Sequence, residues 1–207
     1  MSCCPATALS QLGTGDYVSK GKVTKIDRGG QFDSSDLWLQ TICIVDQPLE
    51  LYVVGSGPKC IVWNYDICGF DSGRTRQMAD LFAEAGYLVI IPDFYRGTWR
   101  IPTAPDIAQY LKDQTNWEKL QQDILKIVLP YAKSRGATSL GALGTCWGSY
   151  MVVRECGYEQ FKAGVSWHPS HSQVARLLGE DEEQLLANIQ CPQLFMPAGA
   201  DAESCKQ

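Results

Sequence analysis

Cys146 has the surroundings that most clearly suggest chemistry. It stands in Gly144-Thr145-Cys146-Trp147-Gly148, after a run of small apolar residues and before a helical pattern. This is the pattern of a nucleophile elbow with cysteine in the place of serine, and its glycines let strand and helix approach closely. A helix N-terminus favours the thiolate, and the backbone N–H of Trp147 can stabilise an oxyanion. The alternative is a glycine-rich turn around a buried cysteine, but the strand–turn–helix context favours catalysis.

The elements that must position Cys146 alternate between strand and helix patterns. Near-continuous apolar strands separated by amphipathic helices predict a mostly parallel sheet flanked by helices, an α/β fold. The predicted strands are 60–65, 88–92, 139–144, 161–167 and 193–197, and the predicted helices are 74–86, 105–112, 117–133, 147–155 and 172–188. Segments 22–26 and 49–54 are predicted to form an antiparallel pair at the sheet edge, and 37–45 could add a third strand.

Composition limits the class of protein. The chain has 207 residues, 45% of them hydrophobic and 20% charged, which predicts one globular domain with residues 1–16 as a flexible N-terminus. A net charge of -5 without a basic cluster argues against a nucleic-acid partner. No apolar run approaches the roughly 20 residues that cross a bilayer, and no secretory signal is recognisable, so no membrane association and a cytoplasmic location are expected.

The cysteines and histidines do not form a metal-binding pattern. Nine cysteines are present without a CxxC pair, and the histidines are His168 and His171. Zinc-ligand spacing is therefore absent, and neither a metal nor another cofactor is expected. In a cytosolic protein most of these thiols are expected to be reduced and buried.

Two further segments accompany the elbow, Tyr65-Asp66-Ile67-Cys68-Gly69-Phe70 and Ile91-Pro92-Asp93-Phe94-Tyr95-Arg96-Gly97. With them, residues 17–26 and 49–201 resemble the dienelactone hydrolase family (carboxymethylenebutenolidase-like), a branch of the α/β hydrolases. A His-Pro-Ser segment like His168-Pro169-Ser170 also occurs in the eukaryotic proteins of this kind. The resemblance implies an α/β-hydrolase fold.

The resemblance also implies roles for individual residues. Cys146 is the expected nucleophile, and Asp201 is the expected acid that orients a histidine. Ile67 and Trp147 are expected to supply the oxyanion-hole N–H groups, and Arg96 is expected to bind a substrate carboxylate. Without the resemblance, the interpretation would be that Asp201 is a turn residue and Arg96 a surface charge.

Asp66 stands where the family often has a glutamate that binds the resting thiol. Because aspartate is shorter than glutamate, the alternative is that Asp66 is only a turn residue. His168 follows a predicted parallel strand at its carboxyl end, where ligands bind in such sheets. It is expected to line the cleft near Cys146, either as a binding residue or as a substitute base.

The sequence departs from the family pattern in two places. In α/β hydrolases the catalytic histidine follows the acid, but the six residues after Asp201 include no histidine. The last helix of the family is also expected to be missing, which predicts exposed apolar surface on one face of the sheet. Residues 27–48 form a predicted insertion, so that a variant or C-terminally truncated product is expected.

These observations favour a hydrolase that opens ester or lactone bonds of small carboxylated molecules through a cysteine nucleophile. The missing histidine is expected to impair its activity. The partner is then a small-molecule substrate. One alternative is a non-catalytic hydrolase fold that retains ligand binding. Another is a redox protein with a reactive elbow thiol.

Overall fold

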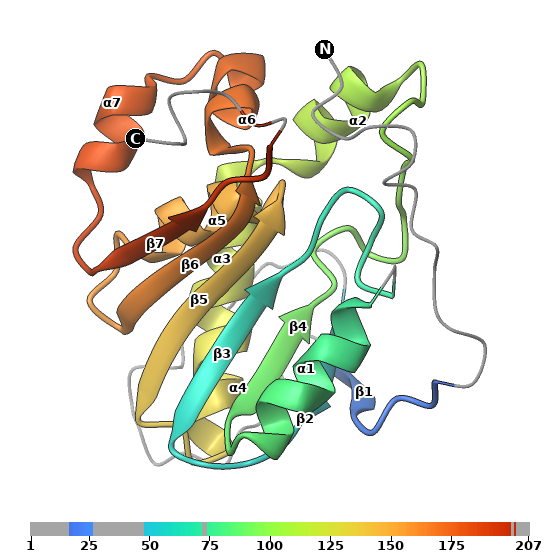
Figure 1. Cartoon of the computed structure of the whole chain (residues 1–207), viewed down its shortest axis with the longest axis vertical. Helices are drawn as coiled ribbons and strands as arrows, with labels where there is room; N and C mark the ends of the chain where they lie inside the picture. Colours follow the sequence, from blue (N-terminus) through green and yellow to red (C-terminus); the bar gives the residue numbers. More distant parts are fainter. Residues whose placement is uncertain (1–16, 27–47, 72–73, 200, 202–207) are drawn as a thin grey trace.

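A computed structural model describes residues 17–26, 48–71, 74–199 and 201, and these form one seven-stranded sheet (Figure 1). Its strand order is β1-β2-β4-β3-β5-β6-β7. Strand β2 pairs antiparallel with both β1 and β4, whereas all pairs among β3, β4, β5, β6 and β7 are parallel. The strands are β1 (Lys22–Ile26), β2 (Leu49–Val54), β3 (Lys59–Asn64), β4 (Leu88–Pro92), β5 (Ser139–Cys146), β6 (Phe161–Pro169) and β7 (Gln193–Met196). The predicted α/β fold and its antiparallel edge are confirmed.

Helices lie on both faces of this sheet. In Figure 1, α1 lies in front of β3 and β4, whereas α3, α4 and α5 lie behind the sheet. Helices α6 and α7 lie toward the carboxyl ends of β5, β6 and β7, the edge at which the nucleophile is expected. The helical segments are α1 (Thr75–Glu84), α2 (Ile107–Gln114), α3 (Trp117–Asp123), a π-helix η3 (Ile124–Val128), α4 (Leu129–Ser134), α5 (Gly148–Glu155), α6 (His171–Leu178) and α7 (Glu182–Ala187).

Two predicted helices differ from the observed ones. The helix predicted over 117–133 is a succession of α3, η3 and α4, so the chain passes through a π-helical turn just before Pro130. The helix predicted over 172–188 is two helices. Gly179 ends the first with a φ of 74°, and the Asp181 side chain accepts N–H groups at the start of the second.

Burial follows the strand order. All five residues of β4 are buried, whereas the edge strand β7 is only partly covered. Leu194 and Met196 of β7 are 54% and 49% exposed, so part of the apolar surface of the sheet faces solvent.

Several predictions lie outside this description. The possible strand at 37–45, nearly all of the predicted insertion and the predicted flexible N-terminus belong to residues that the structure does not describe. Within the described ranges, no helix is long and apolar enough to cross a membrane.

Candidate active site

The turn between β5 and α5 has the geometry of a nucleophile elbow. Cys146, the last residue of β5, has a φ of 54°, a left-handed conformation that strains a non-glycine residue. A Cβ atom on Gly144 would lie 2.2 Å from the Gly148 carbonyl oxygen. One on Gly148 would lie 2.1 Å from the Asn64 carbonyl oxygen. Only glycine therefore permits this close crossing of β5, α5 and β3.

Two serines connect Cys146 to the start of α6. The Ser170 hydroxyl donates to the Cys146 sulfur at 3.6 Å, and the thiol residue is 3% exposed. The Ser149 hydroxyl donates to the Cys146 carbonyl oxygen at 2.7 Å and accepts the Ser170 N–H at 2.7 Å. Ser149 thus links the Cys146 turn to Ser170 through its hydroxyl group. The sequence pattern does not reveal this role.

The expected oxyanion-hole residues lie on two segments. Trp147 directly precedes α5, and its indole N–H donates to the Thr115 hydroxyl at 2.9 Å. Ile67 lies in the loop after β3, and its carbonyl oxygen accepts the Arg100 N–H at 3.0 Å. Asp66 shapes this loop, because its carboxylate accepts the Cys68 N–H at 2.8 Å. These contacts hold both segments in place.

His168 and Asp201 are in contact beside the elbow. His168 belongs to β6, which pairs with β5 so that Cys146 lies opposite Pro169. Its Nδ1 contacts Oδ1 of Asp201, and the Ala198 N–H donates to Oδ2 at 2.6 Å. The Asp201 side chain is 1% exposed and that of His168 21%. A buried carboxylate thus orients a partly accessible imidazole, and the φ of His168 is 50°.

The second histidine has a different environment. His171 lies in the first turn of α6, is 4% exposed and packs on the Phe195 ring at 5.2 Å. Burial lowers its pKa, and the Glu182 carboxylate opposes that effect. His171 is therefore a buried residue packed against β7, away from the contact between His168 and Asp201.

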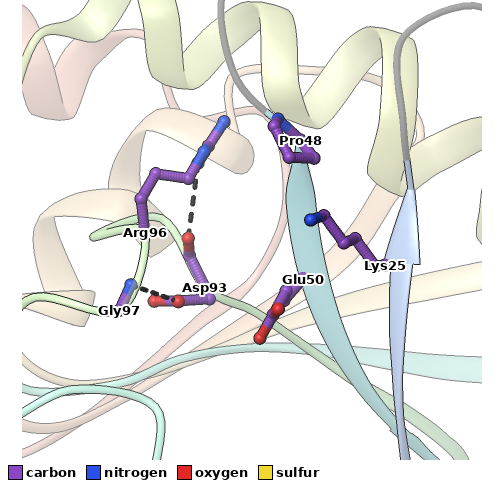
Figure 2. Close-up of a pocket in the computed structure, with 6 residues that line it drawn as sticks. All are labelled: Lys25, Pro48, Glu50, Asp93, Arg96 and Gly97. Atoms are coloured by element: carbon purple, nitrogen blue, oxygen red, sulfur yellow. Dashed lines mark hydrogen bonds between the residues drawn. The ribbon is translucent and has the colours of Figure 1, made fainter.

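Arg96 lies in the loop after β4 and is largely buried. Its guanidinium donates to the Asp123 carboxylate at 2.7 Å, with the side chains 10% and 0% exposed. Burial raises the pKa of Asp123 and Arg96 opposes this. Arg96 also lines a pocket of about 230 Å³ with Asp93, Lys25 and Glu50 (Figure 2). Arg96 is thus part of a buried ion pair rather than a free surface charge.

Comparison with known proteins identifies the group to which this fold and elbow belong. Residues 52–206 match the sequence profile of the dienelactone hydrolase family. The chain belongs to that family. Over 149 residues it is 32% identical to the carboxymethylenebutenolidase homolog of Rattus norvegicus, covering 70% of this chain and 56% of that protein. The chain therefore spans little more than half the length of that relative.

Solved structures share the fold at low sequence identity. An esterase from an Arctic intertidal metagenomic library superposes with a TM-score of 0.60 at 10% identity, covering 94% of this chain and 96% of that one. An acylaminoacyl peptidase of Pyrococcus horikoshii gives 0.55 at 17% identity, covering 86% of this chain and 31% of that one. These likenesses confirm the α/β-hydrolase fold of this dienelactone hydrolase family chain.

The described residues offer no obvious cation site. Within them, no group of three or more His, Cys, Asp or Glu side chains is arranged to hold a metal ion. Their five cysteines are all free thiols: Cys60, Cys68, Cys146, Cys156 and Cys191.

Proposed function

We propose that the chain hydrolyses ester or lactone bonds of small carboxylated molecules with Cys146 as the nucleophile. The observation that carries the proposal is the left-handed φ of Cys146 between β5 and α5, where two glycines permit backbone crossing. Such strain persists where the surrounding structure imposes it, and it is concentrated at functional sites. A merely buried cysteine has no need of it.

Acylation begins when the Cys146 thiol loses its proton and the thiolate attacks the acyl carbon. A carbon–sulfur bond forms while the carbonyl electron pair moves to oxygen. The N–H groups of Ile67 and Trp147 are the proposed donors to this oxyanion. Collapse of the intermediate breaks the carbon–oxygen bond, which releases the alcohol of an ester or opens the ring of a lactone and leaves a thioester on Cys146.

His168 is the proposed base of both steps. Asp201 holds its Nδ1, so Nε2 is the nitrogen that exchanges protons with the thiol, the leaving oxygen and water. In deacylation, His168 takes a proton from water while the water oxygen attacks the thioester carbon. The thiolate then leaves and the carboxylic acid is released. The contact of its Nδ1 with Asp201 supports this role over that of a binding residue.

Arg96 is the proposed partner of a substrate carboxylate. Asp123 already occupies one end of its guanidinium, but Nε is buried without a hydrogen-bond partner in the described part of the chain. Arg96 therefore has a donor that is unused within the described protein, which supports the proposed contact with an anionic substrate. Because a hydrogen bond to a charged group contributes about 1.5–3 kcal/mol, Arg96→Met should lower kcat/KM about 10- to 100-fold for a carboxylated aryl ester. A neutral aryl ester should be hydrolysed as before at a temperature where Arg96→Met, which leaves the buried Asp123 without its partner, is fully folded.

A reducing, cytoplasmic setting suits this chemistry, because the nucleophile must stay a thiol. The experiment that tests the proposal is hydrolysis of p-nitrophenyl acetate by the purified chain. We expect a burst of nitrophenol followed by steady turnover, both lost in Cys146→Ala. His168→Gln should show a slower burst, because the thiol loses its base, and no steady phase. If neither phase depends on Cys146 while ligands still bind, the chain is instead a non-catalytic binding protein of this fold.

A further inference from the structure

Tyr95 is a buried tyrosine beside the elbow, and its ring is fixed on three sides. It follows β4 and Phe94, and is 1% exposed. Its ring centroid lies 4.7 Å from that of Trp147, 5.0 Å from Tyr65 and 5.5 Å from Tyr110. The Tyr95 backbone N–H donates to the Tyr65 hydroxyl at 2.7 Å. The position of its own hydroxyl group is therefore fixed by packing.

The hydroxyl groups around this cluster differ in one respect. Tyr65 donates to the Asp93 carboxylate at 3.2 Å, and the Tyr110 hydroxyl lies 3.0 Å from that of Thr98. In contrast, the Tyr95 hydroxyl is buried and has no hydrogen-bond partner in the described structure. An unpartnered buried donor costs free energy, and a phenylalanine would fill the same space without that cost. The hydroxyl therefore calls for a partner that forms in another state of the site.

The charged groups nearby indicate which partner this is. Burial raises the pKa of Tyr95 well above its usual value, and the titratable groups that add to this are Tyr65, Tyr110, Cys146 and Asp66. The hydroxyl thus keeps its proton and is available as a hydrogen-bond donor. Of these four side chains, the thiol and the carboxyl ionise more readily than the two phenols, and Cys146 is the one that loses its proton in the proposed reaction. The Asp66 carboxylate already accepts the Cys68 N–H.

We propose that Tyr95 is a positioning residue for the nucleophile, whose hydroxyl donates a hydrogen bond to the Cys146 thiolate as it forms. The thiol proton passes to the base, and the tyrosine keeps its own proton throughout. The bond stabilises the thiolate next to Trp147, against whose ring Tyr95 is packed. This inference rests on the proposed function only in taking Cys146 as the reactive thiol.

The test is the rate of Cys146 alkylation by iodoacetamide against pH, followed for each cysteine by peptide mass spectrometry. In Tyr95→Phe we expect the midpoint for Cys146 to move up by about one to two pH units, because a charge-stabilising hydrogen bond is lost. The rate at high pH, where the thiol is ionised in both proteins, should stay within about twofold. Cys191 is the internal reference and should not change.

Two controls separate this role from a structural one. Because the Tyr95 hydroxyl is unpartnered, Tyr95→Phe should melt at the same temperature as the parent chain or higher. Tyr150→Phe is the matched substitution: that hydroxyl bonds Glu180 and Arg154, each at 3.0 Å. It should lower the melting temperature and leave the Cys146 midpoint unchanged.

An unchanged Cys146 midpoint in Tyr95→Phe overturns the inference, even if ester hydrolysis depends on Cys146. The thiolate absorbance at 240 nm, taken as the difference between each protein and its Cys146→Ala version, gives the same midpoint without a reagent. Conversely, a shifted midpoint in a chain without esterase activity would uphold the role of Tyr95 and reject the proposed hydrolysis. The two failures are therefore distinguishable.

Discussion

The carboxyl group of Glu155 should make the stability of this protein depend on pH. Glu155 ends α5, the helix that starts at the elbow, and is 0% exposed. Its Oε2 accepts the side-chain N–H of Asn64 at 2.8 Å, and Asn64 is the last residue of β3. This contact fixes the far end of α5 against the sheet.

The magnitude follows from the burial of this carboxyl. Burial raises the pKa of Glu155 from 4.5 to about 8, although the bond from Asn64 opposes the increase. A raised pKa means that the stabilising contribution is complete below the unfolded value and is lost as the pH rises toward the folded value. Each pH unit in that interval removes about 1.4 kcal/mol, hence about 3 kcal/mol between pH 5 and pH 7.

The assay is urea denaturation of the parent chain and Glu155→Gln at pH 5, 6, 7 and 8. Glutamine does not titrate, so the variant should gain stability relative to the parent by about 3 kcal/mol from pH 5 to pH 7. Glu159→Gln, an exposed glutamate four residues further on, is the matched control and should track the parent. A stability difference between Glu155→Gln and the parent that stays constant over this range would refute the reasoning.

Two further substitutions test the contacts that hold the site. Gly148→Ala places a Cβ 2.1 Å from the Asn64 carbonyl oxygen, so we expect a loss of about 3 kcal/mol or more and slower acylation by p-nitrophenyl acetate. Gly141→Ala, whose nearest contact is an ordinary 3.6 Å, should be much milder in both measurements. Asp123→Ala leaves Arg96 buried without its partner, and denaturation should show a loss of about 3–5 kcal/mol. A loss below about 1 kcal/mol would instead indicate a pair that solvent screens.

The order of elements was predictable because the central strands of this sheet contain runs of apolar residues. Strand β4 is buried at every position, and its sequence Leu88-Val89-Ile90-Ile91-Pro92 contains no polar residue. The helices were less predictable. An apolar face continues from Trp117 to Tyr131, and nothing in that periodicity signals the π-helical turn at Ile124–Val128. Gly179, in contrast, is of the residue type that most often ends a helix, so this boundary can be predicted from the sequence.

The site was predictable where residue type and local turn decide the geometry, as at Cys146. It was less so where partners come from distant segments. The pairing of Arg96 with Asp123 depends on how α3 packs under the loop after β4, which no local pattern encodes. The contact between His168 and Asp201 arises because β6 and β7 are parallel neighbours, so that both strands end at the same edge. Tyr95 lies in the segment from Ile91 to Gly97 that resembles the family, but only the unpartnered hydroxyl seen in the structure distinguishes it.

The most direct test of the central claim is the mass of the intact protein during reaction with p-nitrophenyl acetate. We predict one acetyl group on the parent chain, mapped to the peptide that contains Cys146, which decays as steady turnover proceeds and persists in His168→Gln. A chain that acquires no acetyl group at Cys146, or acquires it only on other residues, would contradict the assignment of Cys146 as the nucleophile.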